Sequence, residues 1–129
     1  GSEVLYTVTV TNTGSGTVDN DTFEITDAVP NDGCMIVRDI GAPGSGPVLF
    51  QDGTPSSGLS YTFISLASGA DDLEFSNDGG LTYGYTPVPD AGGCDIAITH
   101  IRIRPGGTFA ADTGSGSPQA QFSFRAAVN

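Results

Sequence analysis

Strict alternation of side chains near the two ends of the chain constrains the fold more than any other sequence feature. In residues 3–11 and 121–128, an apolar side chain occupies every second position. The apolar set of the first segment is Val4, Tyr6, Val8 and Val10, and that of the second is Phe122, Phe124, Ala126 and Val128. Successive side chains of a β-strand point to opposite faces. Both segments are therefore predicted to be strands.

Short apolar runs between these two segments predict further strands. The runs are residues 22–26, 34–40, 48–50, 59–66, 73–75, 81–85 and 95–104. The apolar side chains change parity near Ile64 and near His100, which indicates a β-bulge at each position. Residues 77–80 read Asn-Asp-Gly-Gly, so a hairpin is predicted between the runs on either side.

Together these patterns predict one all-β domain over residues 1–129, an immunoglobulin-like antiparallel β-sandwich. About eight to ten short strands separated by Gly, Asn, Asp and Pro are typical of that class, and a barrel is the alternative. No segment has a helical period of useful length, and no apolar run approaches the roughly 18 residues of a membrane span. We therefore expect no membrane insertion.

The charge balance excludes two classes of partner. The chain has 15 acidic residues, four arginines and no lysine, which gives a formal net charge of −11. Such a surface repels phosphate groups, so nucleic acid and anionic lipid are not expected to bind. Lys is a common residue for blocking an exposed sheet edge. Its absence predicts that the edges are either covered in another way or used for pairing.

The two cysteines, Cys34 and Cys94, lack the close spacing of a metal knuckle or a redox pair. A structural disulfide is the favoured interpretation, and two free buried thiols are the alternative. A persisting disulfide requires an oxidising compartment, so an extracellular or cell-surface location is predicted. Since the sequence has no initiator methionine and no signal peptide, we expect a processed mature subunit or an excised repeat.

Two motifs near the start of the chain resemble a known family. Residues 6–14 read Tyr-Thr-Val-Thr-Val-Thr-Asn-Thr-Gly, and residues 25–30 read Ile-Thr-Asp-Ala-Val-Pro. They are similar to the conserved repeat domain of large bacterial secreted and cell-surface proteins, in which a Tyr-x-Val-x-Val strand precedes one ending in Thr-Asp-x-x-Pro. The resemblance implies an immunoglobulin-like sandwich, export, and a role as a spacer, adhesin segment or structural subunit.

This chain departs from the family at its beginning, because members usually carry a further strand before the Tyr-x-Val-x-Val strand. Either that strand has been cut off, or a neighbouring chain fills its place. The second option predicts a homo-oligomer or homopolymer joined by strand addition. In that case an assembly strand would bury alternate side chains in a neighbouring subunit, namely Val4, Tyr6, Val8 and Val10.

A second resemblance is local. Residues 76–83 look like the Asp-box, a Ser-x-Asp-x-Gly-x-Thr-aromatic motif of sialidases and other β-proteins, where it lies away from the active site. The resemblance implies a structural turn in which the Asp side chain caps the backbone and the aromatic ring packs below. The matching residues are Ser76, Asp78, Gly80, Thr82 and Tyr83.

The sequence offers no catalytic constellation. His100 is the only histidine and lies inside a predicted strand, where a general base would lack a cleft and a positioned nucleophile. Carboxylate pairs carry little information in a chain with 15 acids, and the absence of Trp argues against a glycosidase cleft. We expect that the protein is not an enzyme.

Calcium is the one cofactor that the sequence suggests. Four acidic residues bring hard oxygen ligands together on predicted loops, as Ca²⁺ requires. They are Asp19, Asp21, Asp71 and Asp72. No run matches the spaced Asp loop of the EF-hand, so solvated loop carboxylates are the alternative.

The leading functional hypothesis is a non-catalytic extracellular structural protein, a subunit or repeat of a bacterial surface filament, sheath or layer. Its subunits would assemble through β-strand contacts. The alternative is a carbohydrate- or ligand-binding adhesin module of a cell-surface protein. The predicted fold serves both roles equally well.

Overall fold

The computed structural model describes residues 2–128, so Gly1 and Asn129, the end residues of the predicted domain, lie outside the described part. Within residues 2–128 the chain forms ten β-strands and no helix. The described part therefore contains no helix that could cross a membrane. Every strand pair is antiparallel, which confirms the prediction of an all-β antiparallel fold.

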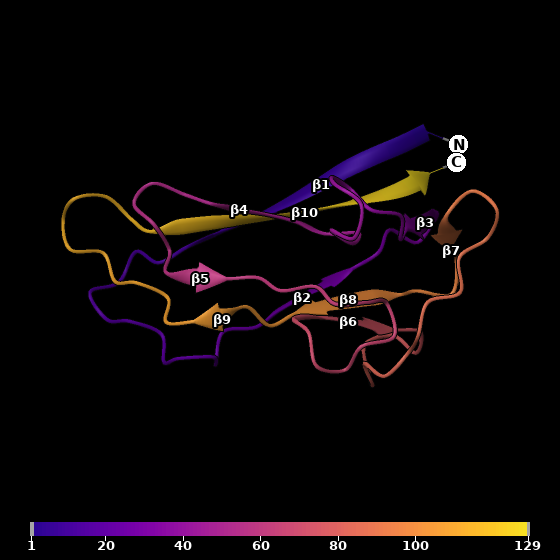
Figure 1. Ribbon diagram of the computed structural model, residues 1–129. Helices are drawn as coiled ribbons and strands as arrows, with labels where there is room; N and C mark the ends of the chain where they lie inside the picture. The colour runs from indigo at the N-terminus through magenta and orange to yellow at the C-terminus, as the bar shows by residue number, and fades with distance from the viewer. Residues whose placement is uncertain (1, 129) are drawn as a thin grey trace.

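The first sheet is built around β10 (Gln119–Val128). β1 (Ser2–Thr11) pairs with it along ten residues, from Ser2 opposite Val128 to Thr11 opposite Gln119. On its other side β10 pairs first with β4 (Leu49–Asp52) and then with β3 (Gly33–Ile36), to which β7 (Cys94–Asp95) adds. Figure 1 shows β1 and β10 side by side along the length of the molecule.

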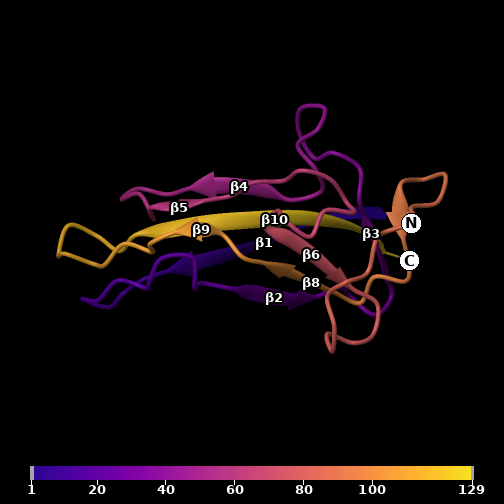
Figure 2. The same ribbon diagram turned by 60° about the horizontal axis from the view of Figure 1, so that its bottom comes forward.

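The facing layer contains a second and a third sheet. β8 (His100–Ile103) lies between β2 (Ile25–Ala28) and β6 (Leu73–Ser76), and β5 (Leu59–Ser60) pairs with β9 (Gly106–Gly107). Figure 1 shows these strands in a layer opposite β10, and Figure 2 shows β2, β8 and β6 side by side. The two layers make a β-sandwich, and the strand order of its main sheet is β1-β10-β3-β7.

The core lies between the two layers, because alternation points one side-chain set of each strand inward. β10 contributes Phe122 and Phe124, and the facing layer contributes Leu73, Phe75, Ile101 and Ile103, all almost fully buried. The ring of Phe124 stacks on Tyr6 at 5.4 Å between centroids, and Phe122 lies 5.2 Å from Phe50. The strongly alternating strands of the sequence thus form the packed interior.

Two predicted strands are much shorter than expected. The run at 34–40 is a strand only to Ile36, because the chain then turns around Asp39, whose carboxylate accepts hydrogen bonds from the backbone N–H groups of Gly44 and Gly46 at 2.8 and 2.7 Å. The run at 59–66 is a strand only at Leu59–Ser60. Beyond Ser60, the carboxylate of Asp72 accepts a hydrogen bond from the N–H of Thr62, and that of Asp71 accepts one from the N–H of Ile64. The predicted continuation of the strand and the predicted bulge near Ile64 are therefore wrong.

The predicted hairpin at residues 77–80 is also wrong. The turn exists, but Asp78 accepts a hydrogen bond from the N–H of Thr82, and residues 81–85 form no strand. The chain instead returns beside β6 in parallel, through a single bridge between Phe75 and Gly84.

The long strand predicted at 95–104 is interrupted rather than bulged. β7 ends at Asp95, whose carboxylate accepts a hydrogen bond from the N–H of Ala97 at 2.9 Å, and β8 begins at His100. In the turn between them, Ile98 is 3% exposed and Ile96 is 80% exposed. The parity change in the sequence reflects this turn.

Candidate functional site

The outer edge of β1 is the longest exposed strand edge of the described residues. β10 pairs with one side of β1, and within residues 2–128 no strand pairs with the other. The backbone N–H and C=O groups of every second residue along this ten-residue strand therefore point outward without a strand partner. The strand holds no Pro and one charged residue, Glu3. An edge that is long, neutral and free of Lys is a template for pairing with another chain.

The four residues predicted to form an assembly strand share the inward face of β1. Val4, Tyr6, Val8 and Val10 are half-buried, while Leu5 and the threonines on the other face are exposed. Tyr6 and Val10 pack against the core of their own chain. A neighbouring chain can therefore reach the backbone edge of β1 without displacing this face.

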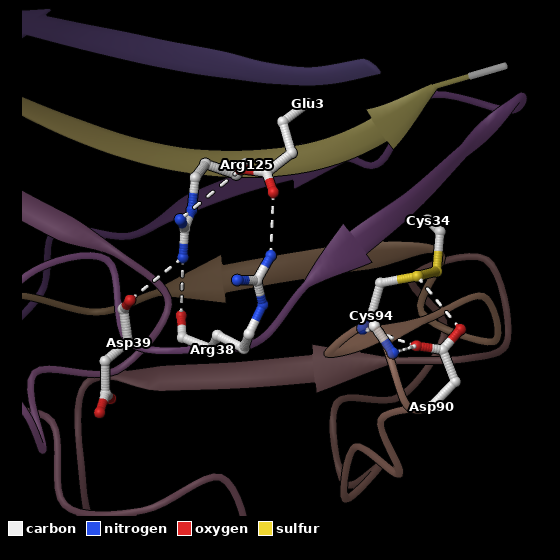
Figure 3. Close-up of polar contacts among 8 residues, drawn as sticks. Glu3, Cys34, Arg38, Asp39, Asp90, Cys94 and Arg125 are labelled. Carbon is white, nitrogen blue, oxygen red and sulfur yellow. Dashed lines mark hydrogen bonds and ion pairs between the residues drawn. A yellow bond between two sulfur atoms is a disulfide. The ribbon is translucent and has the colours of Figure 1, made fainter. Parts of the chain in front are cut away.

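An ion cluster fixes the start of β1 to the rest of the sheet. Glu3 lies 2.9 Å from the guanidinium of Arg38 and 3.7 Å from that of Arg125. Arg125 also donates hydrogen bonds to the backbone carbonyls of Arg38 and Asp39, each at 3.1 Å. Figure 3 shows these contacts converging from β1, β10 and the segment after β3. Such exposed pairs are individually weak, but together they orient the edge strand.

The predicted disulfide is present. Cys34 of β3 and Cys94 of β7 are joined across 60 residues of sequence, with their Cα atoms 5.6 Å apart. Asp90 accepts hydrogen bonds from the N–H groups of Gly92 and Cys94 at 2.9 and 3.2 Å, which closes the loop before β7. Figure 3 shows Asp90 beside the two sulfurs.

Within residues 2–128, Cys34, Asp90 and Cys94 are the one group of three His, Cys, Asp or Glu side chains whose ligand atoms already lie within 4.8 Å of one another. Both sulfurs are bonded to each other, so neither is a thiolate that could bind a metal. The disulfide therefore joins β3 and β7 covalently at this corner of the sandwich.

The turn predicted from residues 76–83 is organised by Asp78. Its carboxylate accepts hydrogen bonds from the hydroxyl groups of Ser76 and Thr82, each at 2.6 Å, and from the N–H of Thr82 at 2.9 Å. Ser76 in turn accepts the N–H of Gly80 at 2.9 Å. The hydroxyl of Tyr83 lies close to Gly80 of the turn, and the Tyr83 ring also stacks on Arg102, whose guanidinium carbon is 4.5 Å from the ring centroid.

The hydrogen bonds from Ser76 and then Thr82 lower the pKa of Asp78 from 3.8 to about 2. A folded-state pKa below the unfolded value means that this carboxylate stabilises the fold above about pH 4, and that the contribution is lost as the pH falls toward 2. We expect Asp78→Asn to lower the melting temperature at pH 6 by more than it does at pH 2. Thermal melts of the variant, the wild type and the exposed-turn control Asp32→Asn measure this. An equal deficit at both pH values would contradict the assignment.

Three of the four predicted calcium ligands line one hollow, of about 370 Å³. They are Asp21, Asp71 and Asp72, and Ser60, Thr62 and Arg104 lie beside them. Asp19 is not among the lining residues, although it lies only two positions before Asp21. The carboxylate of Asp21 accepts a hydrogen bond from the N–H of Gly107 at 2.7 Å, which holds this side chain beside β9.

Asp71 and Asp72 differ in burial within this hollow. Asp71 is 5% exposed, and its Oδ2 accepts the N–H groups of Ile64 and Ser65 while its Oδ1 has no partner. Asp72 is half-buried and accepts the N–H of Thr62 at 2.8 Å. Burial, followed by the charges of Asp71 and Asp21, raises the pKa of Asp72.

Two further buried polar groups, on Tyr61 and His100, lack a hydrogen-bond partner within residues 2–128, which was not predicted from the sequence. The hydroxyl oxygen of Tyr61 has no hydrogen-bond partner, and burial, then Asp71 and Asp72, raises its pKa. The Nδ1 atom of His100 is also enclosed without a partner. Tyr61 could have been suspected, because it occupies an inward position in the alternating run that begins at Leu59.

No family model matches this chain, and neither the curated proteins nor the solved structures contain a match. The resemblance of residues 6–14 and 25–30 to a surface repeat domain therefore stays a prediction. The function has to be argued from the geometry described above.

Proposed function

We propose that this chain is a non-catalytic structural domain of an extracellular filament, sheath or surface layer, and that its subunits join by strand pairing at β1. The observation that carries the proposal is the open ten-residue edge of β1. Rows of unpaired backbone N–H and C=O groups are satisfied when another strand adds to them. Each net hydrogen bond contributes about 0.5–1.5 kcal/mol.

The other edge of the same sheet supports a head-to-tail contact. It consists of β4 and β7, which pair only with β10 and β3 within the described residues. When β1 of one copy meets this different edge of the next, the interface is heterologous and the assembly stays open. A repeated contact of this kind builds a filament, whereas β1 pairing with β1 would close a dimer.

One further observation favours an extracellular setting, and a second concerns the solubility of single domains. The disulfide between Cys34 and Cys94 persists in oxidising compartments such as the bacterial exterior. The four arginines are engaged by only two acidic residues, Glu3 and Glu74. The remaining acidic surface keeps single domains soluble and directs association toward the neutral edge.

The edge contact can be tested with substitutions that leave the core untouched. We expect Leu5→Lys with Thr9→Lys to weaken self-association at least about tenfold, since exposed Lys on an edge strand opposes pairing and tenfold corresponds to about 1.4 kcal/mol. Leu81→Lys is the matched control, because Leu81 is 85% exposed in a loop and Leu5 is 58% exposed on β1. Sedimentation velocity and negative-stain electron microscopy measure the assemblies.

Two outcomes would contradict strand-mediated assembly through β1. If the wild-type protein remains monomeric at high concentration from about pH 5 to 8, with and without Ca²⁺, strand-mediated assembly is wrong. Equal weakening by Leu81→Lys would also contradict a specific role for β1.

A ligand-binding adhesin module is the second candidate, and one observation favours it. A hollow of about 300 Å³ at the end of the sandwich is lined by Ala28, Pro30, Asn31, Ile96, Ile98 and His100. It combines apolar walls with a histidine whose Nδ1 has no partner. Binding of glycans or peptides by a monomeric wild-type protein, lost on His100→Ala, would move this candidate ahead of the first.

A further inference from the structure

Asp71 presents an unusual electrostatic situation. Its side chain is almost completely buried, yet Oδ1 has no hydrogen-bond partner and no arginine forms an ion pair with it. Within residues 2–128 the arginine ion pairs go to Glu3 and Glu74. Buried carboxylates in proteins are normally paired with a positive charge or bound to a metal ion.

The surroundings add negative charge instead of relieving it. Asp72 follows in sequence, and Asp21 reaches the same hollow from a loop some fifty positions earlier in the chain. Arg104 is the one cationic group in the lining of this hollow, and its guanidinium lies 2.7 Å from Glu74. Three carboxylates thus share a cavity with one cation, Arg104, whose charge acts on Asp72 but whose ion pair is with Glu74.

We propose that this hollow binds Ca²⁺, with Asp71 and Asp72 as the carboxylate ligands and Asp21 closing the site from the opposite loop. Ca²⁺ takes six to eight oxygen ligands in flexible geometry and accepts water and neutral oxygens among them. The hydroxyl groups of Ser60 and Thr62 belong to the same lining. Mg²⁺ demands a smaller, near-octahedral arrangement, which a hollow of about 370 Å³ does not impose.

The spacing of the carboxylates sets the expected affinity. The three aspartates do not form a tight group in residues 2–128, so the ion has to draw them together and keep part of its water. Sites of this kind in extracellular modules bind with dissociation constants of about 10⁻⁴–10⁻³ M. We expect the same range here, with weaker binding of Mg²⁺.

Calorimetric titration of the chelator-treated protein with CaCl₂, together with thermal melts, tests the site. In the wild type, heat of binding and a rise in melting temperature should both occur at about 0.1–1 mM Ca²⁺. Asp71→Asn and Asp72→Asn should each raise the dissociation constant at least about tenfold, since each removes a charged ligand. Asp19→Asn is the matched control, and it should bind as the wild type does because Asp19 lies outside the hollow.

A second readout covers the case in which Asp71→Asn does not fold. The chain has no Trp, so emission from bound Tb³⁺ must be sensitised by tyrosine. In the wild type, Ca²⁺ should displace Tb³⁺ and quench this emission. Tyr61→Phe should lose most of the emission, while its calorimetric titration with CaCl₂ still shows binding. The proposal is overturned if the wild type shows no Ca²⁺-dependent heat or melting shift, or if Asp72→Asn and Asp19→Asn respond alike.

Discussion

Replacing Cys34 and Cys94 together with serine is expected to lower the free energy of unfolding by about 4 kcal/mol, as the chain-entropy model gives for a tie across 60 residues. The reason lies in the unfolded chain, which gains freedom when the tie is removed. A domain of this size is typically stable by about 5–15 kcal/mol, so the loss is a large share of the total. β7 should separate first, because it is only two residues long.

Urea denaturation of the oxidised wild type, the reduced wild type and the double serine variant measures the effect. The reduced wild type and the variant should agree, because both lack the covalent tie. A difference from the oxidised protein of less than about 1 kcal/mol would show that the denatured chain is scarcely constrained by the disulfide.

Phe122→Ala is expected to destabilise the domain by about 3–5 kcal/mol, the usual cost of removing a buried Phe. Phe122 is 1% exposed on the central strand β10. Its ring lies 5.2 Å from that of Phe50 and 6.1 Å from that of Tyr61, so truncation opens a cavity among three aromatic side chains. Few neighbours can collapse into that space, because β10 is held by strands on both sides.

Leu5→Ala serves as the control for the Phe122 substitution, since Leu5 points to solvent and should cost less than about 0.5 kcal/mol. Phe122→Leu provides a milder variant, expected below about 1.5 kcal/mol, in case the alanine variant is unfolded. Chemical denaturation of all three gives the comparison. If Phe122→Ala costs no more than Leu5→Ala, the core does not lie where β10 faces the second layer.

The sequence predicts the two longest strands well because their environment is simple. β1 and β10 alternate without interruption, so the inward sets around Tyr6 and Phe124 follow directly from a period of two. The disulfide could be predicted too, because the two cysteines lack the close spacing of a metal knuckle or a redox pair.

The shorter strands fail for one recurring physical reason, which is the capture of backbone N–H groups by aspartate side chains. Asp72 accepts the N–H of Thr62, Asp78 that of Thr82, and Asp95 those of Ala97 and Val88. Each such bond offers the backbone an alternative to a β-ladder. Hydrophobic periodicity does not register this competition, so the strand predicted at 59–66 is cut short, the one at 95–104 is interrupted, and the one at 81–85 does not form.

For the candidate sites too, the sequence predicts the residue types but does not predict which residues meet in space. The sequence singled out Asp21, Asp71 and Asp72 as ligand types, but their meeting in one hollow depends on how separate loops fold together. The burial of Asp71 and of the Tyr61 hydroxyl has the same origin. Likewise, nothing near Glu3 in the sequence indicates that Arg38 and Arg125 will surround it.

The pairing of Ser2 with Val128 has a mechanical consequence for any assembly that contains this domain. These two residues pair at one end of the β1–β10 ladder, which Figure 1 shows. Tension applied between them would part the two strands rung by rung, because antiparallel ladder bonds run perpendicular to the strands and would be loaded one at a time. A pull along the edge of β1 would instead load all its contacts at once. We therefore expect an assembly that is joined through the β1 edges to withstand more force than one in which tension acts between the two ends of each domain.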